Sequence, residues 1–175
     1  MNTIVRPPAI NQEVDWDKSE TIISKTDKFG TIEYCNEVFC NVSGYEDYEL
    51  MYSPHNIIRH PDMPKVVFKW LWDNLNNDTT IVAIAKNLAK SGRYYWVYAN
   101  FTILKDEKGD NHYFSSRKAV SKKVIEIIEP IYKKLLEIEA EGGMEASETF
   151  LINFLKENKT TYNEFIDKIL KENNN

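Results

Sequence analysis

The chain has 175 residues, of which 42% are hydrophobic and 28% charged, and it carries a formal net charge of −5. This length and composition suit one globular domain with a short appendage. The acidic balance, with no stripe of lysine and arginine, excludes the electrostatic footprint of a nucleic-acid-binding protein. No apolar run approaches the roughly 20 residues that span a bilayer, so we expect no direct membrane insertion.

Two cysteines, Cys35 and Cys40, form neither a disulfide framework nor a CxxC pair. We expect them to be buried thiols in a reducing compartment. The first residues lack the continuous apolar segment of a signal peptide. These observations predict a cytoplasmic protein.

The first quarter of the chain predicts an extension, a hairpin and a short helix. Residues 1–19 are polar and proline-bearing, and we expect this N-terminal extension to be extended and loosely held. Strands are predicted at 20–26 and 31–35, with a tight turn between them. Asn36 is a favourable helix N-cap, and Gly44 supplies the left-handed C-cap that ends this helix.

A longer helix and three strands follow. The helix is predicted to start after Asp62, with Pro64 in its first turn, and to end at residues 76–78. The strands are rich in β-branched and aromatic residues and form an antiparallel meander, at 81–90, 93–104 and 111–120. This order of elements predicts an α+β fold, in which short helices gather on one face of a five-stranded antiparallel sheet.

The last third of the chain predicts helices. An amphipathic helix covers residues 121–140, and Pro130 is expected to kink it. Gly142 and Gly143 stop this helix, and a helical tail occupies residues 141–175. A capping box of Thr161 and Glu164 opens the last helix of the tail.

Two segments identify a family. GTIEYCNEVFCNVSGYEDYEL and the later run PHNIIRHPDMP resemble the PAS domains of bacterial aerotaxis and energy-taxis transducers, and YYWVYANFTIL and YFSSRKAV look like that family's closing strands. The resemblance covers about residues 20–120, and HNIIRHPDMP is its most specific part. It implies a PAS fold, with residues 20–120 as the sensor domain and 121–140 as a signalling helix.

The resemblance also implies a function. In this family the module binds FAD noncovalently, senses its redox state and passes the signal to a chemotaxis transducer. The positions associated with flavin match here at Arg59, His60, Asp62 and Trp72. The chain looks like a stand-alone version, which would dock on a separate membrane-bound transducer or another PAS domain, or form a homodimer.

The chain departs from the family in its first long strand. Ile81 and Ala83 stand where the family has a tryptophan and a nearby glycine, and Leu88 and Ala89 replace the arginine that follows the Lys-Asn pair. An aromatic wall and an arginine are therefore missing. The departures leave open a different mode of flavin binding or a different ligand.

Each candidate side chain also has a structural interpretation. Arg59 could bind a phosphate or the flavin edge bidentately, or be a surface arginine paired with an acid. His60 could hydrogen-bond a cofactor, ligate haem, or be satisfied by backbone. Asp62 is well placed to cap the following helix. Trp72 could be a core residue or stack on a ring, and Asn87 could orient a ligand or bond to backbone.

Tyr94, Trp96 and Tyr98 share one strand face, and they indicate either an exposed interface or a surface covered by the N-terminal segment or the C-terminal helices. The three histidines lack metal-ligand spacing, and no catalytic constellation is present, so we expect neither a metal site nor an enzyme. Three functions remain open. They are an FAD-binding sensor, a cofactor-free PAS interaction module, and a haem gas sensor using His60.

Overall fold

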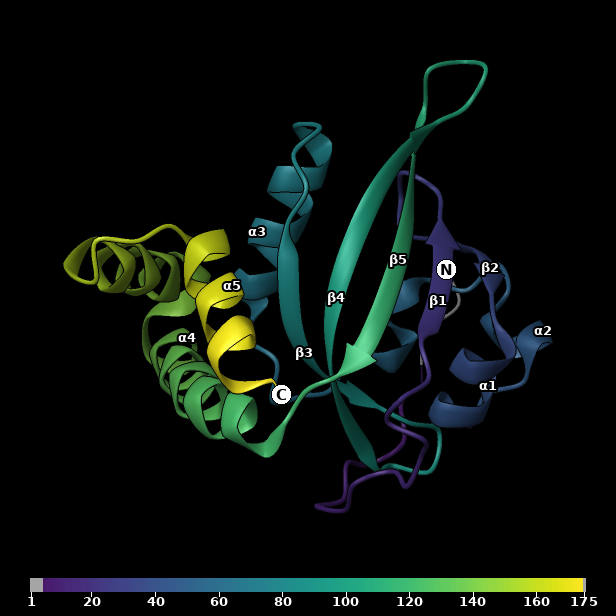
Figure 1. Cartoon of the computed structure of the whole chain (residues 1–175), viewed down its shortest axis with the longest axis horizontal. Coiled ribbons are helices and arrows are strands. Elements are labelled where there is room, and N and C mark those ends of the chain that lie inside the picture. The colour runs from purple at the N-terminus through teal and green to yellow at the C-terminus, as the bar shows by residue number, and fades with distance from the viewer. Residues whose placement is uncertain (1–4, 175) are drawn as a thin grey trace. The chain divides into compact units, whose positions relative to one another are not determined.

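The computed structural model describes residues 5–174, so four residues of the expected N-terminal extension and the last residue of the tail lie outside it. The elements are β1 (Ile22–Thr26), β2 (Ile32–Cys35), α1 (Glu37–Ser43), α2 (Asp47–Leu50), the 3-10 helix η1 (His55–Ile58), α3 (Lys65–Asn76), β3 (Val82–Leu88), β4 (Tyr94–Lys105), β5 (Asn111–Ala119), α4 (Lys122–Glu157) and α5 (Tyr162–Asn173) (Figure 1). The predicted α+β fold with five strands is confirmed. Over the described residues, no helix combines the length and apolar character that crossing a membrane requires.

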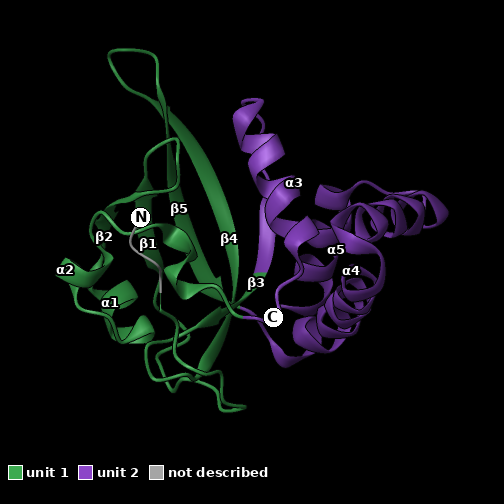
Figure 2. Ribbon diagram, turned by 180° about the vertical axis from the view of Figure 1, so that it is seen from behind, with its two compact units in different colours: residues 1–60, 85–119 green, residues 61–84, 120–175 purple. Residues whose placement is uncertain are grey.

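The chain divides into two compact units, shown in different colours in Figure 2. Unit 1 comprises Met1–His60 and Ala85–Ala119, and unit 2 comprises Pro61–Ile84 and Val120–Asn175. The boundary between the units runs through β3. The limits expected for a sensor domain, a signalling helix and a tail remain predictions.

The sheet has the strand order β2-β1-β5-β4-β3, so β5 lies between β1 and β4. Both of these partners are antiparallel to β5, with Ser24 opposite Ser115 and Ala99 opposite Arg117. A strand that is paired on both edges has its backbone hydrogen bonds satisfied within the sheet. The side chains of β5 are therefore held in a fixed register against two neighbours.

Helix α1 is fixed to the first hairpin by its N-cap, as predicted. The Asn36 side-chain oxygen accepts from the backbone N–H of Phe39 and of Ile23, each at 3.0 Å, and the side-chain amide donates to the carbonyl of Thr21 at 2.9 Å. Gly44 ends the helix with a φ of 71°, which glycine adopts without a Cβ clash. One asparagine thus caps the helix and ties it to β1.

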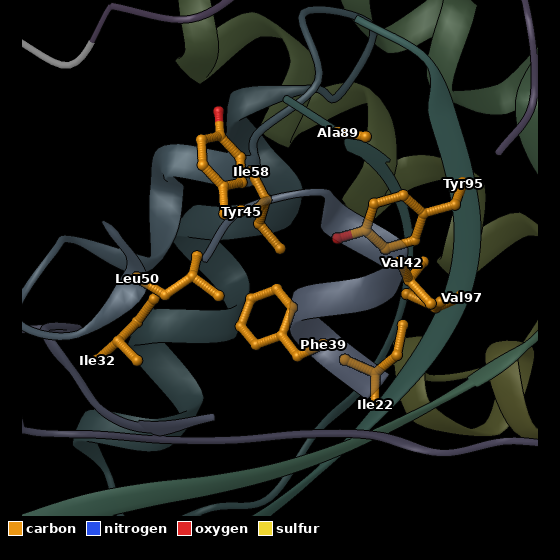
Figure 3. Packing of buried hydrophobic residues seen from close by; sticks show 10 residues of the cluster. All are labelled: Ile22, Ile32, Phe39, Val42, Tyr45, Leu50, Ile58, Ala89, Tyr95 and Val97. Atoms are coloured by element: carbon orange, nitrogen blue, oxygen red, sulfur yellow. The ribbon is translucent and has the colours of Figure 1, made fainter. Parts of the chain in front are cut away.

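The core of unit 1 lies between these strands and the short helices (Figure 3). Its buried side chains come from β1, β2, α1, α2, η1, β4 and the loops between them: Ile22, Ile32, Phe39, Val42, Tyr45, Leu50, Ile58, Ala89, Tyr95 and Val97. The prediction that short helices gather on one face of the sheet is therefore confirmed for α1, α2 and η1.

The two cysteines flank the start of α1. Cys35 and Cys40 are half-buried rather than fully buried as expected, and their Sγ atoms lie 3.9 Å apart. This spacing places them at the positions just before the N-cap and in the first turn, which often pack together. Burial, and then the neighbouring Cys40, raise the pKa of Cys35 to about 11.

The N-terminal segment is paired with the sheet, so the expectation that it is loosely held is wrong. Val14 N–H donates to the carbonyl of Tyr94 at 2.8 Å, and Tyr94 N–H donates to the carbonyl of Gln12 at 2.9 Å. Ile10 N–H donates to the carbonyl of Gly92 at 2.8 Å. Local sequence could not predict this pairing, because the partners are about 80 residues apart.

Gly92 makes the close approach of this segment possible. Its φ is 84°, and a Cβ built at this position would lie 2.4 Å from the carbonyl oxygen of Pro8. Real Cβ atoms do not approach a backbone oxygen so closely. Gly92 is therefore required both by its backbone conformation and by the segment packed against it.

In unit 2, the first turn of α3 is capped by a residue from another helix. Pro64 is the N-cap and supplies no side-chain hydrogen bond, while the amides of Lys65 and Val66 each donate to the Glu139 carboxylate at 3.0 Å. The interpretation of Asp62 as the cap is therefore wrong. The carboxylate comes from α4 and complements the partial positive charge of the α3 N-terminus.

The C-terminal helices agree closely with those predicted from the sequence. The only residue of α4 with non-helical dihedral angles is Gly143, at φ 77° and ψ 179°, so the helix is interrupted there as predicted. Pro130 lies inside α4 and keeps helical dihedral angles, and the kink expected there remains a prediction. The capping box of Thr161 and Glu164 opens α5 as predicted.

We predict that Gly92→Ala destabilises the protein more than Gly109→Ala does. Both glycines have a positive φ, but nothing lies within 4 Å of a Cβ at Gly109. The control should lose about 1–2 kcal/mol from backbone strain. Gly92→Ala should lose a further ~1–3 kcal/mol from overpacking and expose the N-terminal segment to limited proteolysis. Equal losses in urea unfolding would show that the contact with Pro8 is unimportant.

A second prediction concerns the cap of α3. Glu139→Ala removes the acceptor of two first-turn amides and should lower the unfolding free energy by about 1–2 kcal/mol. Glu137→Ala is the matched control, because Glu137 makes only an exposed ion pair with Lys134. That change should stay within about 0.5 kcal/mol of the parent. Urea denaturation measures both, and a harmless Glu139→Ala would contradict the assignment.

Candidate functional site

The five residues predicted to contact a ligand fall into both units. Arg59, His60 and Asn87 belong to unit 1, whereas Asp62 and Trp72 belong to unit 2. Asp62 is exposed in the turn before α3, and Trp72 is half-buried on α3. The structure therefore describes these two sets separately, and a common role at one ligand remains a prediction for all five.

Within unit 1, the backbone brings the predicted residues together. Arg59 and Asn87 form an isolated antiparallel bridge, although they are 28 positions apart in the sequence. His60 and Asn87 are buried, and Arg59 is half-buried. Arg59 as a ligand contact and Arg59 as a surface arginine paired with an acid both remain predictions.

His60 lies in an aromatic environment that also holds a buried lysine. Its ring meets the Tyr94 ring edge-on, with centroids 6.4 Å apart and planes at 87°. The Lys86 ammonium lies 4.7 Å from the centroid of Tyr94 and 5.8 Å from that of Trp96. Such contacts stabilise a cation that has left water.

The expected exposed aromatic face is not observed. Trp96 is only 4% exposed, and Tyr94 and Tyr98 are intermediate. The N-terminal segment pairs through its backbone with Tyr94 and so lies beside this strand, while its covering of the aromatic face remains a prediction. The interface predicted at these three aromatics is therefore wrong for Trp96.

A buried polar cluster in the core of unit 1 was not among the predicted sites. We call it the Arg117 cluster, and it consists of Ser24, His55, Tyr95, Ser115 and Arg117. Arg117 is 4% exposed, and its Nη2 atom donates to Ser24 Oγ at 2.9 Å and to His55 Nε2 at 2.6 Å. The side chains come from β1, η1, β4 and β5, so the fold assembles them from across unit 1.

The charges of this cluster follow from burial. Desolvation lowers the pKa of Arg117 to about 10, which leaves it charged at neutral pH. Burial, and then the charge of Arg117, hold the pKa of His55 well below its usual value. Because arginine cannot accept a hydrogen bond, the neutral His55 must accept at Nε2 and carry its proton on Nδ1.

Three polar atoms of the cluster are buried without a hydrogen-bond partner among the described residues. They are Nη1 of Arg117, the hydroxyl of Tyr95 and the hydroxyl of Ser115. Buried polar groups are nearly always paired, so unpaired ones need an explanation such as an ion, a water or a ligand. All three atoms can donate a hydrogen bond, and therefore they suit a ligand with acceptor atoms.

A sequence signal for this cluster exists. With a period of two, β1 places Ile22, Ser24 and Thr26 on its buried face, and β5 places Ser115 and Arg117 on the same side as these residues. Polar residues at successive inward positions of a central strand are unusual in a closed core. The signal is visible only once β5 is known to lie between two strands.

The site offers hydrogen bonds rather than metal ligands or a nucleophile. Within residues 5–174, no group of three or more histidine, cysteine, aspartate or glutamate side chains could hold a metal ion. The Arg117 cluster provides a fixed positive charge and two hydroxyls in an environment of low dielectric constant. That combination can orient an electron-rich organic ligand and respond to its charge.

Comparisons with known proteins agree with the family resemblance found in the sequence. Residues 32–116 match the PAS fold family. The chain is 40% identical to the aerotaxis receptor of Escherichia coli (strain K12) over 115 residues, which are 66% of this chain and 23% of the receptor. The chain therefore corresponds to about a quarter of the length of that relative.

Solved structures share the fold at low identity. A light-oxygen-voltage domain studied with a flavin analogue has a TM-score of 0.57 and 17% identity, covering 63% of this chain and 84% of that one. The light-state domain of the blue-light photoreceptor Aureochrome1 has a TM-score of 0.56 and 16% identity, covering 62% and 88%. At these identities the likeness shows the PAS fold alone.

The lowered pKa of His55 predicts a pH dependence of stability. The unfolded chain binds a proton at His55 near pH 6.5, which the folded chain resists, so stability is present above this pH and is lost as pH falls below it. His55→Gln keeps an acceptor for Arg117 but cannot titrate. We expect the loss of unfolding free energy between pH 6.5 and 5.5 to be smaller in this variant by up to about 1.4 kcal/mol. Parallel pH profiles from urea unfolding would refute the assignment of His55 as a neutral histidine.

Proposed function

The chain contains a PAS domain of the aerotaxis receptor family, and from that premise we propose that it is a cytoplasmic redox or energy sensor that holds FAD noncovalently and relays its state to a chemotaxis transducer. The observation that carries this proposal is the Arg117 cluster, with three buried donors that lack a protein partner. A core that served only packing would gain stability by replacing such groups with apolar ones.

Several side chains of unit 1 offer the hydrogen-bond donors that a flavin would need. The isoalloxazine ring has several carbonyl and nitrogen acceptors, which suit the free donors of the Arg117 cluster. Arg59, which is joined to Asn87 through the backbone, would bind a phosphate or a ring edge, and Asn87 would fix its orientation. His60 belongs to the same proposed set, whereas Asp62 and Trp72 lie in unit 2 and remain separate predictions, with stacking on a ring as the proposed role of Trp72.

A bound flavin supplies reversible reduction, which changes the charge and protonation of its ring. The protein must convert this change into a shift between two conformations. β5 carries Arg117 and ends at Ala119, and α4 begins only three residues later at Lys122. A displacement of β5 would therefore reach the start of α4 through the chain itself.

The partner in this proposal is a membrane-bound chemotaxis transducer, another PAS domain or a second copy of the chain. The role is signalling rather than catalysis, because the described site offers hydrogen-bond donors and no nucleophile aligned with a base. A cofactor-free interaction module and a haem sensor that uses His60 are the competing functions. Optical spectroscopy separates all three.

We predict that the purified protein is yellow, shows flavin absorbance that bleaches on reduction, and releases FAD on denaturation. Arg59→Gln should lower the flavin content at least several-fold, because it removes a charged donor. Arg93→Gln, in the turn before β4, is the control and should keep the parental content. A colourless protein that does not bind added FAD would overturn the proposal. A Soret band lost in His60→Ala would instead establish haem.

A further inference from the structure

Among residues 5–174, Arg117 is a buried cation without an acidic partner. The structure gives it the hydroxyl of Ser24, the neutral ring of His55 and the face of Phe39, 5.5 Å from the guanidinium carbon. None of these groups carries a negative charge. Removing an ion from water is costly by several kcal/mol, and neutral hydrogen bonds offset only part of this.

The missing interactions of this cation are concentrated on one side. Nη2 uses both of its hydrogens, one for Ser24 and one for His55, whereas Nη1 has no partner among the described residues. The guanidinium is thus anchored through one nitrogen and presents the other. Such an arrangement suits a guanidinium whose orientation is fixed by the protein and whose remaining nitrogen can bind a ligand.

Two further donors accompany the free nitrogen. Ser115 precedes Arg117 by two positions on the same strand face, and its hydroxyl is unpartnered. The Tyr95 side chain points its hydroxyl into the core cluster (Figure 3). Burial raises the pKa of Tyr95 and the charge of Arg117 opposes this rise, so the guanidinium lies within electrostatic range of the Tyr95 hydroxyl.

A purely structural role explains these observations poorly. Stacking on Phe39 stabilises the cation, but it leaves the free nitrogen and both hydroxyls unsatisfied. A single bridging water could satisfy hydrogen bonds but would not neutralise the charge. A ligand with acceptor atoms would satisfy the hydrogen bonds, and it would also neutralise the charge once it became anionic.

We infer that the Arg117 cluster is the charge-sensing end of the cofactor site, where Nη1 of Arg117 donates to an acceptor edge of the ring and stabilises the negative charge that reduction adds to it. This inference rests on the proposed function. Two electrons from a reduced electron carrier, dithionite in the experiment, and one proton from water convert the neutral ring to a reduced ring with one negative charge. The guanidinium supplies the counter-charge and keeps its own protons.

The same geometry gives a route for the signal. When the ring becomes negative, the guanidinium is drawn toward it, and the bonds from Nη2 to Ser24 and His55 weaken. Ser24 belongs to β1 and His55 to η1, so the redox state of the ring is felt outside β5. Arg117 thereby connects the ligand to two other elements of unit 1.

The test compares Arg117→Met with Lys118→Met. Methionine matches much of the length of the arginine but has no charge or donor, and Lys118 is the exposed neighbour on the opposite strand face. Spectroelectrochemical titration of the FAD-loaded proteins should show that Arg117→Met lowers the midpoint potential by 30 mV or more. This shift corresponds to at least a tenfold weaker preference for the reduced ring in a two-electron couple. Lys118→Met should keep the parental potential.

Unfolding of the ligand-free proteins provides an independent readout. Removal of an uncompensated buried charge should leave ligand-free Arg117→Met at least as stable as the parent. If the arginine had a structural role, the same substitution would lower the unfolding free energy. Tyr95→Phe is a milder variant that removes only an unpartnered hydroxyl. It should fold normally and weaken FAD binding about fivefold.

The outcomes separate the two proposals. If the parent binds FAD but Arg117→Met keeps its potential, the charge-sensing role is overturned and the flavin sensor stands. A clear loss of stability in ligand-free Arg117→Met would also overturn it, in favour of a structural role. If Arg117→Met does not fold, unchanged FAD affinity in Tyr95→Phe would count against the site. A parent that does not bind FAD removes both proposals.

Discussion

The buried charge of Arg117 is the constraint around which the core of unit 1 is organised. An arginine can leave water only where several groups receive its hydrogens, and here Ser24, His55 and Phe39 converge on it from three different elements. Their convergence requires β5 to lie beside β1 and η1 to approach the sheet. The apolar core surrounds this cation, yet it does not neutralise it.

Much of unit 1 could be predicted because its signals are local. The N-cap at Asn36 and the positive φ at Gly44 depend on residues within a few positions of each other, and both predictions are confirmed. The same holds for the capping box at Thr161. Where a short segment determines its own conformation, the residue types and their spacing were sufficient to predict the structure.

Three of the errors have the opposite origin, since each involves a part of the chain that is distant in sequence. Asp62 is a reasonable cap by position, but Glu139 from α4 takes two amides of that first turn. The N-terminal segment has few local signals and is ordered by pairing with β4. Trp96 lies on a strand face that the alternation of residues predicts to be exposed, and it is buried.

The candidate site was predicted only in part. The sequence identified Arg59, His60 and Asn87, which the structure brings together, but it did not identify Arg117. A strand with serine and arginine at inward positions resembles a half-exposed strand until both of its neighbours are known.

This failure of local rules is itself informative about function. Sequences usually satisfy packing, polar groups and charge together, and departures are concentrated where a protein binds or reacts. A cofactor-free interaction module has no need for an unpaired guanidinium nitrogen and two unpaired hydroxyls inside its core, because apolar residues of similar volume would stabilise it more. A sensor has such a need, since only an incompletely satisfied charge can respond strongly when its ligand changes charge. The unpartnered polar atoms of the Arg117 cluster therefore favour a ligand-responsive PAS domain over a purely structural one.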